Sequence, residues 1–137
     1  MSPLPLAAGA RHRYAARRRP EMNDRFDELR RRIIAFRDER DWRQFHDPKN
    51  LAEGLSVEAG ELLEVFLWKP SGEAAELDEA DRQRVREEAA DVFMFLVYLS
   101  EAFGFDLLEA TKEKLAVNGR KYPVEKARGR SDKYNRL

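Results

Sequence analysis

The sequence predicts an all-α protein, a bundle of about four helices. Apolar residues recur at spacings of three and four over several long stretches, and no segment alternates apolar and polar residues as a strand does. The chain of 137 residues is about one domain long, and 38% of its residues are charged, which suits helices with solvated outer faces. We therefore expect one helical domain.

The first residues differ in character from the rest of the chain. Residues 1–22 hold Pro, Ala and clustered Arg without apolar periodicity, so we predict a disordered extension, with Met22 as the working start of the domain. The alternatives are an upstream start codon before the working start at Met22, and an Arg-rich transit peptide. No run resembles the apolar core of a secretory signal or reaches the length of a membrane span, and there is no cysteine. We expect a cytoplasmic protein with no membrane partner.

The first half of the domain contains two predicted helices. A first helix should begin with Asn23 or Asp24 as its N-cap and end near Arg40, because apolar residues recur with helical spacing between these positions. An Asp-Pro pair then begins the second helix, in which Asp47 is the N-cap and Pro occupies the first helical position. This helix is expected to run to about Trp68, and a loop rich in Pro, Ser and Gly follows it.

The second half of the domain adds two more helices and a tail. Asp78 is the expected N-cap of the third helix, which should end at Gly104. Asp106 should cap the fourth helix, which ends by Asn118. The helical domain then spans residues 23–118. Residues 119–137 are basic, and we expect them to form an extended arm of the same domain.

Two acidic pairs interrupt the apolar runs of the second and third predicted helices. Glu58 and Glu61 lie three apart in LSVEAGELLEVFLWK, as do Glu88 and Asp91 in REEAADVFMFLVYL. Residues three apart on a helix lie about 60° from each other around its axis, so each pair shares a face. Glu64 lies about 240° round from Glu58 and is not expected to join the site.

Four carboxylates that meet between antiparallel helices would repel one another, so a cation must lie between them. Oxygen ligands without Cys or His suit Mg²⁺, or Mn²⁺ as a substitute, better than zinc. The alternative is that the acids form surface salt bridges with nearby Lys and Arg. The apolar residues that flank both pairs favour the metal site.

These motifs also carry a family resemblance. EAGEL followed by EEAADV resembles the E-x-x-E and E-x-x-D signature of the MazG-like all-α nucleotide pyrophosphohydrolases. FHDPKNLAEGLSVEAGELLEVFLWK, KLAVNGRKYP and DKYNRL resemble the branch typified by dCTP pyrophosphatase, so that the resemblance spans residues 24–137. It implies Mg²⁺-dependent hydrolysis of a dNTP, with dCTP or a modified pyrimidine dNTP favoured, to dNMP and pyrophosphate. It also implies a homodimer or homotetramer.

The resemblance assigns roles to the acids and to a later basic segment. It implies that the metal ligands are Glu58, Glu61, Glu88 and Asp91. One of the first pair is expected to orient or deprotonate the attacking water, which makes Glu58 and Glu61 the candidate catalytic residues. The side chains expected to reach the triphosphate are Lys114, Asn118, Lys121 and Tyr122. For these residues, and for Lys121 in particular, the alternative is a basic helix end that complements the helix dipole.

The base is expected to lie among aromatic and polar side chains. By the same resemblance these are Trp42, His46 and Trp68, together with Phe95. Phe95 departs from the pattern because the dCTP branch is expected to have Tyr there, so a hydroxyl group is lost. Two of these residues have an alternative to a role in binding the base. Trp68 could be a core residue, and His46 could cap the loop.

Two other functions stay open at this point. The protein could be a MazG relative that acts on another nucleotide, or a non-catalytic helical dimerisation module whose acids bind a structural ion. A nucleic-acid polymer is not an expected partner, because the body of the chain beyond its first residues is mildly acidic. House-cleaning of the nucleotide pool is the expected purpose of the enzyme.

Overall fold

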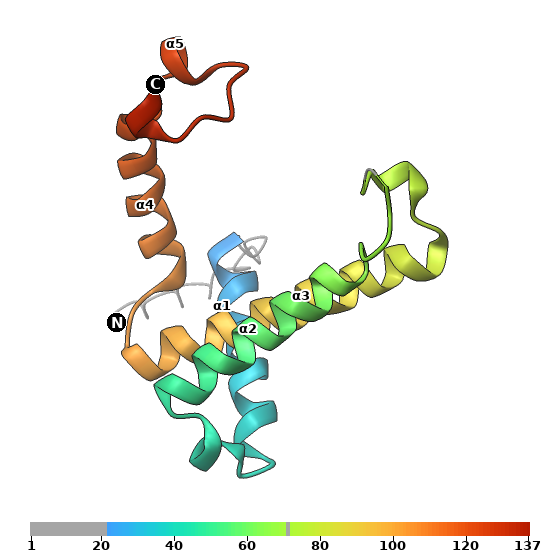
Figure 1. The fold of residues 1–137 in the computed structure, drawn as a ribbon. Coiled ribbons are helices and arrows are strands. Elements are labelled where there is room, and N and C mark those ends of the chain that lie inside the picture. Colours follow the sequence, from blue (N-terminus) through green and yellow to red (C-terminus); the bar gives the residue numbers. More distant parts are fainter. Residues whose placement is uncertain (1–21, 71) are drawn as a thin grey trace, which may run out of the picture.

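The computed structural model describes residues 22–70 and 72–137, and this part of the chain is helical without β-strands (Figure 1). The predicted extension before Met22 lies outside the described residues. The helices are α1 (Met22–Asp38), α2 (Pro48–Glu64), α3 (Glu79–Phe103), α4 (Leu107–Lys121) and the short α5 (Val124–Ala127). Two 3₁₀ turns lie between helices, η1 (Trp42–Phe45) and η2 (Ala74–Glu76), and a third, η3 (Tyr134–Arg136), follows α5. The predicted all-α class is confirmed.

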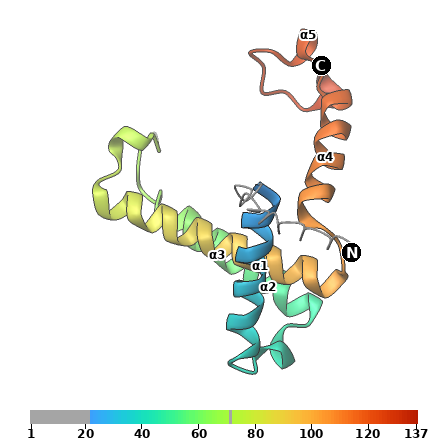
Figure 2. The same cartoon turned by 180° about the vertical axis from the view of Figure 1, so that it is seen from behind.

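An antiparallel hairpin of α2 and α3 is the main body of the fold. The two helices lie side by side along most of α2, and α1 crosses α3 at a steep angle (Figures 1 and 2). α4 turns away from the end of α3 and has few contacts with the other helices. Of the four long helices, three therefore pack together within one chain.

Capping residues set four of the eight ends of the long helices where the sequence predicts them. The side chains of Asp47, Asp78 and Asp106 each accept a hydrogen bond from the backbone N–H three residues further on. Gly104 ends α3 in the left-handed conformation, with φ 68°, and its N–H bonds to carbonyls of the last turn. The boundaries of α3 and the start of α2 and α4 thus follow from local chemistry.

α2 ends four residues earlier than the sequence indicated. Beyond Glu64 the backbone N–H groups of Phe66, Leu67 and Lys69 bond to the carbonyl three residues back, so the chain closes into tight turns. Pro70 follows, and the residue before a proline disfavours the helical conformation. The second predicted helix is therefore wrong at its C-terminal end.

Other predicted boundaries need smaller corrections. α1 already includes Asn23 and Asp24, so neither is its N-cap, and α1 stops at Asp38. α4 continues three residues past Asn118 to Lys121. The basic tail contains α5 and η3 and is not wholly extended.

The buried core joins the first three helices. Ile33 of α1, Leu51 of α2, and Val97 and Tyr98 of α3 form one cluster. The Tyr98 hydroxyl donates a long hydrogen bond of 3.4 Å to the Ile33 carbonyl, which also ties α1 to α3. Because this cluster contains residues of both α2 and α3, it fixes the spacing of the two helices that carry the acidic residues.

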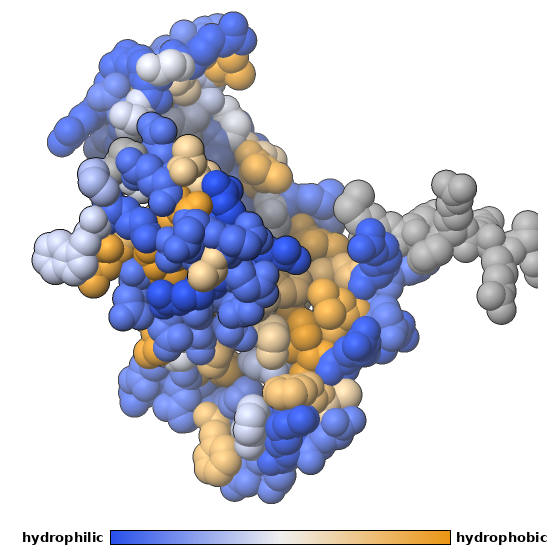
Figure 3. Space-filling model, turned by 90° about the vertical axis from the view of Figure 1, so that its right-hand side faces the viewer, coloured by the Kyte–Doolittle hydropathy of each residue, from blue (hydrophilic) through white to orange (hydrophobic). Residues whose placement is uncertain are grey.

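Large apolar side chains also remain on the surface. Leu63 on α2 is 71% exposed, and Leu115 on α4 is 64% exposed. Figure 3 shows apolar side chains gathered on one face of the molecule. None of the helices within residues 22–70 and 72–137 combines the length and the apolar character needed to cross a bilayer.

Leu51→Ala tests the core. Leu51 is only 1% exposed, so its truncation should lower the free energy of unfolding by about 2–5 kcal/mol through lost burial and the cavity left behind. Denaturant unfolding followed by circular dichroism measures this change. Leu29→Ala is the matched control, because Leu29 of α1 is 45% exposed. Equal losses in the two variants would contradict this description of the core.

Candidate functional site

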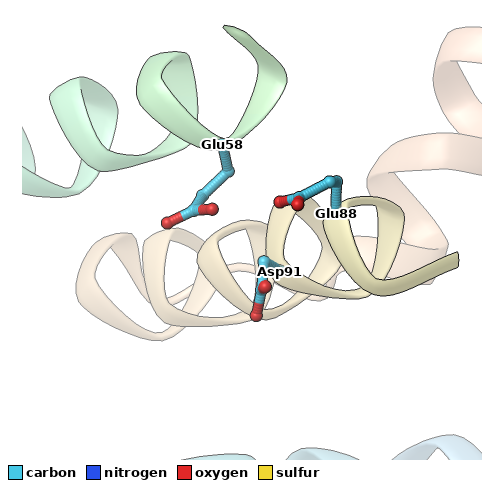
Figure 4. A group of neighbouring side chains, drawn as sticks. All are labelled: Glu58, Glu88 and Asp91. Atoms are coloured by element: carbon cyan, nitrogen blue, oxygen red, sulfur yellow. The ribbon is translucent and has the colours of Figure 1, made fainter. Parts of the chain in front are cut away.

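Acidic side chains from α2 and α3 converge in the hairpin. Glu58 comes from α2, and Glu88 and Asp91 come from successive turns of α3 (Figure 4). One carboxylate oxygen from each residue lies within 4.8 Å of the others. Glu61 is exposed and stands outside this group of three. The structure thus brings together three of the four acids that the sequence singled out.

The carboxylates repel one another. Burial raises the pKa of Glu58 above its ordinary value, and the negative charges of Glu61, Asp91 and Glu88 raise this pKa further. Within the described part of the chain, none of these four acids forms an ion pair with Lys or Arg. The structure therefore does not support the alternative of surface salt bridges.

These acids form a suitable set of ligands for a hard divalent cation. All the donor atoms are carboxylate oxygens, which Mg²⁺ and Mn²⁺ prefer, and three of the groups are close enough to share one ion. Burial is the main reason that the pKa of Glu58 is raised, and a cation would relieve the repulsion that raises this pKa further. Glu58, Glu88 and Asp91 could thus hold a metal, with Glu61 close enough to contribute charge.

A cavity of about 330 Å³ opens beside the carboxylates. Its lining consists of Phe36, Trp42, His46, Glu58, Asp91, Met94, Phe95 and Tyr98. Five of these are residues that the sequence analysis assigned to the site: Trp42, His46, Glu58, Asp91 and Phe95. Acidic groups and aromatic rings therefore line the same cavity. This combination suits a ligand that has both charged groups and a flat base.

Phe36, Met94 and Tyr98 also line the cavity, and sequence reasoning missed them as site residues. Met94 and Tyr98 lie three and seven residues after Asp91, which places them on the same face of α3. That spacing was a usable signal. Phe36 had no comparable signal, because it reaches the cavity only through the crossing of α1 and α3 and packs edge-on against Trp42.

The turn η1 places His46 against the cavity. The ring of His46 lies 4.8 Å from the ring of Tyr98, and its Nδ1 atom is buried without a hydrogen-bond partner among the described residues. Burial lowers the pKa of His46, the positive charge of Arg37 lowers it further, and Asp38 opposes them. The imidazole is therefore neutral at pH 7 and offers one donor and one acceptor.

Arg37 is a buried charge behind the cavity. It is 4% exposed, its Nε donates a hydrogen bond of 2.7 Å to Asp38, and its guanidinium lies over the ring of Tyr98 at 6.0 Å. It supports the Tyr98 side of the cavity. Nothing in its local sequence distinguishes it from the exposed arginines of α1.

Comparison with known proteins identifies the family. The model of the MazG-like family matches residues 54–137. The chain belongs to the MazG-like family. It is 42% identical to human dCTP pyrophosphatase 1 and 41% identical to the bovine protein of that name, in each case over 113 residues and 81% of this chain. The match covers 66% of the human protein and 67% of the bovine protein.

A solved structure has the same fold as this MazG-like chain. The crystal structure of a pyrophosphatase from Archaeoglobus fulgidus matches it with a TM-score of 0.67 and 42% identity. The match covers 72% of this chain and 93% of the archaeal one. The likeness therefore extends over most of the helical body.

The remaining predicted site residues of the MazG-like chain lie away from the cavity. Trp68 does not line it; this residue is 91% exposed and has φ 65°, so the alternative that it is a core residue is wrong. Lys114 and Asn118 border a separate shallow hollow on α4. Lys121 lies over the ring of Tyr134 at 5.0 Å, and Tyr122 packs edge-on against the same ring. Because α4 points away from the hairpin, one chain alone does not bring these groups to the carboxylates (Figure 1).

Glu58→Gln tests the repulsion in metal-free protein. Because the pKa of Glu58 is raised on folding, its charged form destabilises the native state at pH 7; this penalty shrinks as the pH falls through the raised pKa and is gone only below the ordinary pKa of 4.5. The variant should therefore melt at a higher temperature than wild type at pH 7, with a smaller difference at pH 4.5.

Thermal melts in a chelating buffer at both pH values measure this effect. Glu64→Gln is the matched control on α2, since Glu64 faces Arg84 at 3.7 Å instead of the cluster. Addition of Mg²⁺ should stabilise wild type more than Glu58→Gln. A gap between wild type and Glu58→Gln that does not change with pH would contradict the electrostatic account.

Proposed function

We propose that this MazG-like protein is a nucleoside triphosphate pyrophosphohydrolase that cleaves a dNTP to dNMP and pyrophosphate. The observation that carries the proposal is the carboxylate group of Glu58, Glu88 and Asp91, two members of which line a cavity with aromatic walls. The names of the mammalian relatives favour dCTP, or a modified pyrimidine dNTP, as the substrate. House-cleaning of the nucleotide pool in the cytoplasm is the purpose we assign to it.

Glu58, Glu88 and Asp91, with Glu61 beside them, would hold Mg²⁺, for which Mn²⁺ could substitute. When bound, the ion neutralises charge on the phosphate oxygens and on the transition state. A carboxylate of the Glu58 and Glu61 pair orients a water molecule and accepts its proton. The water oxygen forms a bond to the α-phosphorus, the bond to the bridging oxygen breaks, and pyrophosphate leaves with that electron pair.

The aromatic cavity supplies the base site in this proposal. Trp42 and Phe95 offer ring faces for stacking, which contributes affinity for any base. His46, neutral at pH 7, can form a hydrogen bond to one base edge, and a competing base without the matching group would lose that bond. Phe95 carries no hydroxyl, so it contributes shape and stacking only.

A second copy of the chain completes the site. The residues assigned to the triphosphate are Lys114, Asn118, Lys121 and Tyr122, and all of them lie on α4 or directly after it. α4 stands away from its own hairpin, and the apolar side chains of Leu115 on α4 and Leu63 on α2 are exposed in the single chain. We therefore assign a homodimer or homotetramer in which α4 and Trp68 of one copy approach the cavity of another.

Glu61→Gln and Asp91→Asn should each abolish turnover while the circular dichroism spectrum stays helical, because the amide keeps the shape and loses the charge. Activity is measured with each dNTP and Mg²⁺ as orthophosphate, with and without added inorganic pyrophosphatase. Wild type should give signal only when pyrophosphatase is present. Orthophosphate released without it would contradict cleavage between the α and β phosphorus, and near-normal activity of either variant would contradict the metal assignment.

Mixed oligomers test whether two chains build one site. Asp91→Asn and Lys121→Ala should each be inactive alone. Co-refolding in equal amounts should restore about a quarter of wild-type activity if dimers form at random, since half are mixed and each mixed dimer has one intact site of two. A mixture of Asp91→Asn with Glu88→Gln is the control and should stay inactive, because both residues belong to the same side of the site. Failure of the first mixture to gain activity would contradict a shared site.

A further inference from the structure

Gly54 lies where α2 passes the aromatic ring of Phe95 on α3. A Cβ atom built on Gly54 would lie 2.6 Å from Cζ and 3.0 Å from Cδ1 of Phe95, and closer still to Cε1. Ordinary contacts of this kind are 3.4–4 Å. Gly60, in the same helix, would place its Cβ in open space. The close approach of a ring to the helix backbone is therefore a feature of position 54.

Phe95 stands between this backbone and the cavity. One edge of its ring faces Gly54, and the side chain also lines the cavity with Trp42 and His46. Its ring meets Tyr98 edge-on at 6.0 Å, and Tyr98 is 4% exposed and bonded to the Ile33 carbonyl, so Tyr98 has little freedom to yield. A ring pushed away from α2 must therefore move into the cavity.

We infer that Gly54 is a specificity-determining residue of the base pocket: the missing side chain lets Phe95 sink against α2 and thereby sets the depth of the cavity. This inference rests on the proposed function, because it treats the cavity as the site of the base. Gly54 touches no substrate itself. It acts through the position of Phe95, and any side chain at position 54 makes the pocket shallower.

Gly54→Ala should raise KM for the preferred dNTP about tenfold, the scale on which one methyl group acts in a tight pocket, with kcat changed less than about twofold. The substitution leaves the carboxylates in place, so the variant should lose affinity for the substrate and keep most of its turnover rate. Among dATP, dGTP, dCTP and dTTP, the increase in KM should be larger for the purines, whose rings need the greater depth. Steady-state kinetics on the full chain, with Mg²⁺, measures both effects.

Phe95→Leu is the complementary variant. The smaller side chain deepens the pocket, so the ratio of kcat/KM for purine over pyrimidine substrates should rise. In the double variant, Gly54→Ala with Phe95→Leu, the clash at position 54 is relieved. Its KM should therefore lie well below that of Gly54→Ala, which a loss caused only by general damage to the helix would not produce.

Gly60→Ala controls for helix propensity. It should raise the melting temperature slightly and leave the ratio between bases unchanged, because it meets no other atom within 4 Å. If Gly54→Ala does not fold, the comparison of the double variant with Phe95→Leu decides the matter: these two differ only at position 54, and the added Ala should lower the ratio of kcat/KM for purine over pyrimidine substrates. An active wild type whose ratio between bases is the same in every folded variant overturns the role of Gly54 and leaves the proposed function standing. A wild type that turns over no nucleotide overturns the proposed function itself.

Discussion

This structure depends on one constraint, the mutual repulsion among a few carboxylates. The packing of α2 against α3 forces these groups together. Three acidic groups share a space 4.8 Å across, and burial together with the charges around Glu58 raises its pKa. The favourable burial of a core cluster offsets this repulsion and holds the two helices in position. The cluster consists of Ile33, Leu51, Val97 and Tyr98. A divalent cation between the acids would convert the repulsion into binding, and in the proposed function the aromatic walls beside them would hold the base of a nucleotide.

Much of this arrangement could be predicted from the sequence, because it follows from local rules. Asp47, Asp78 and Asp106 cap helices through their own backbone neighbours, and the spacing of Glu88 and Asp91 places both on one face of α3. Apolar periodicity then orients these faces toward the core. Fold class, the main helices and the convergence of Glu58 with Glu88 and Asp91 all depend on interactions of this kind.

The rest depends on tertiary contacts that no short pattern encodes. The cavity includes Phe36 because α1 crosses α3, and Arg37 is buried behind Tyr98 although it resembles its exposed neighbours in sequence. The early end of α2 is an exception, because it reflects local tight turns before Pro70. No sequence pattern distinguishes Gly54 from other helical glycines, because its close contact with the ring of Phe95 arises from the packing of α2 against α3. The roles of Lys114, Lys121 and Trp68 still rest on the family resemblance, because these side chains lie away from the cavity of their own chain.

Binding of Mn²⁺, followed by the electron paramagnetic resonance signal of the free ion, tests most directly whether the carboxylate group is a cation site. Wild type should remove Mn²⁺ from solution, and Mg²⁺ should compete for the same site. Glu88→Gln should bind Mn²⁺ much more weakly, while Glu64→Gln, changed on the same pair of helices outside the group, should bind it as wild type does. Equal Mn²⁺ affinity in wild type and Glu88→Gln would contradict the assignment of these acids as metal ligands.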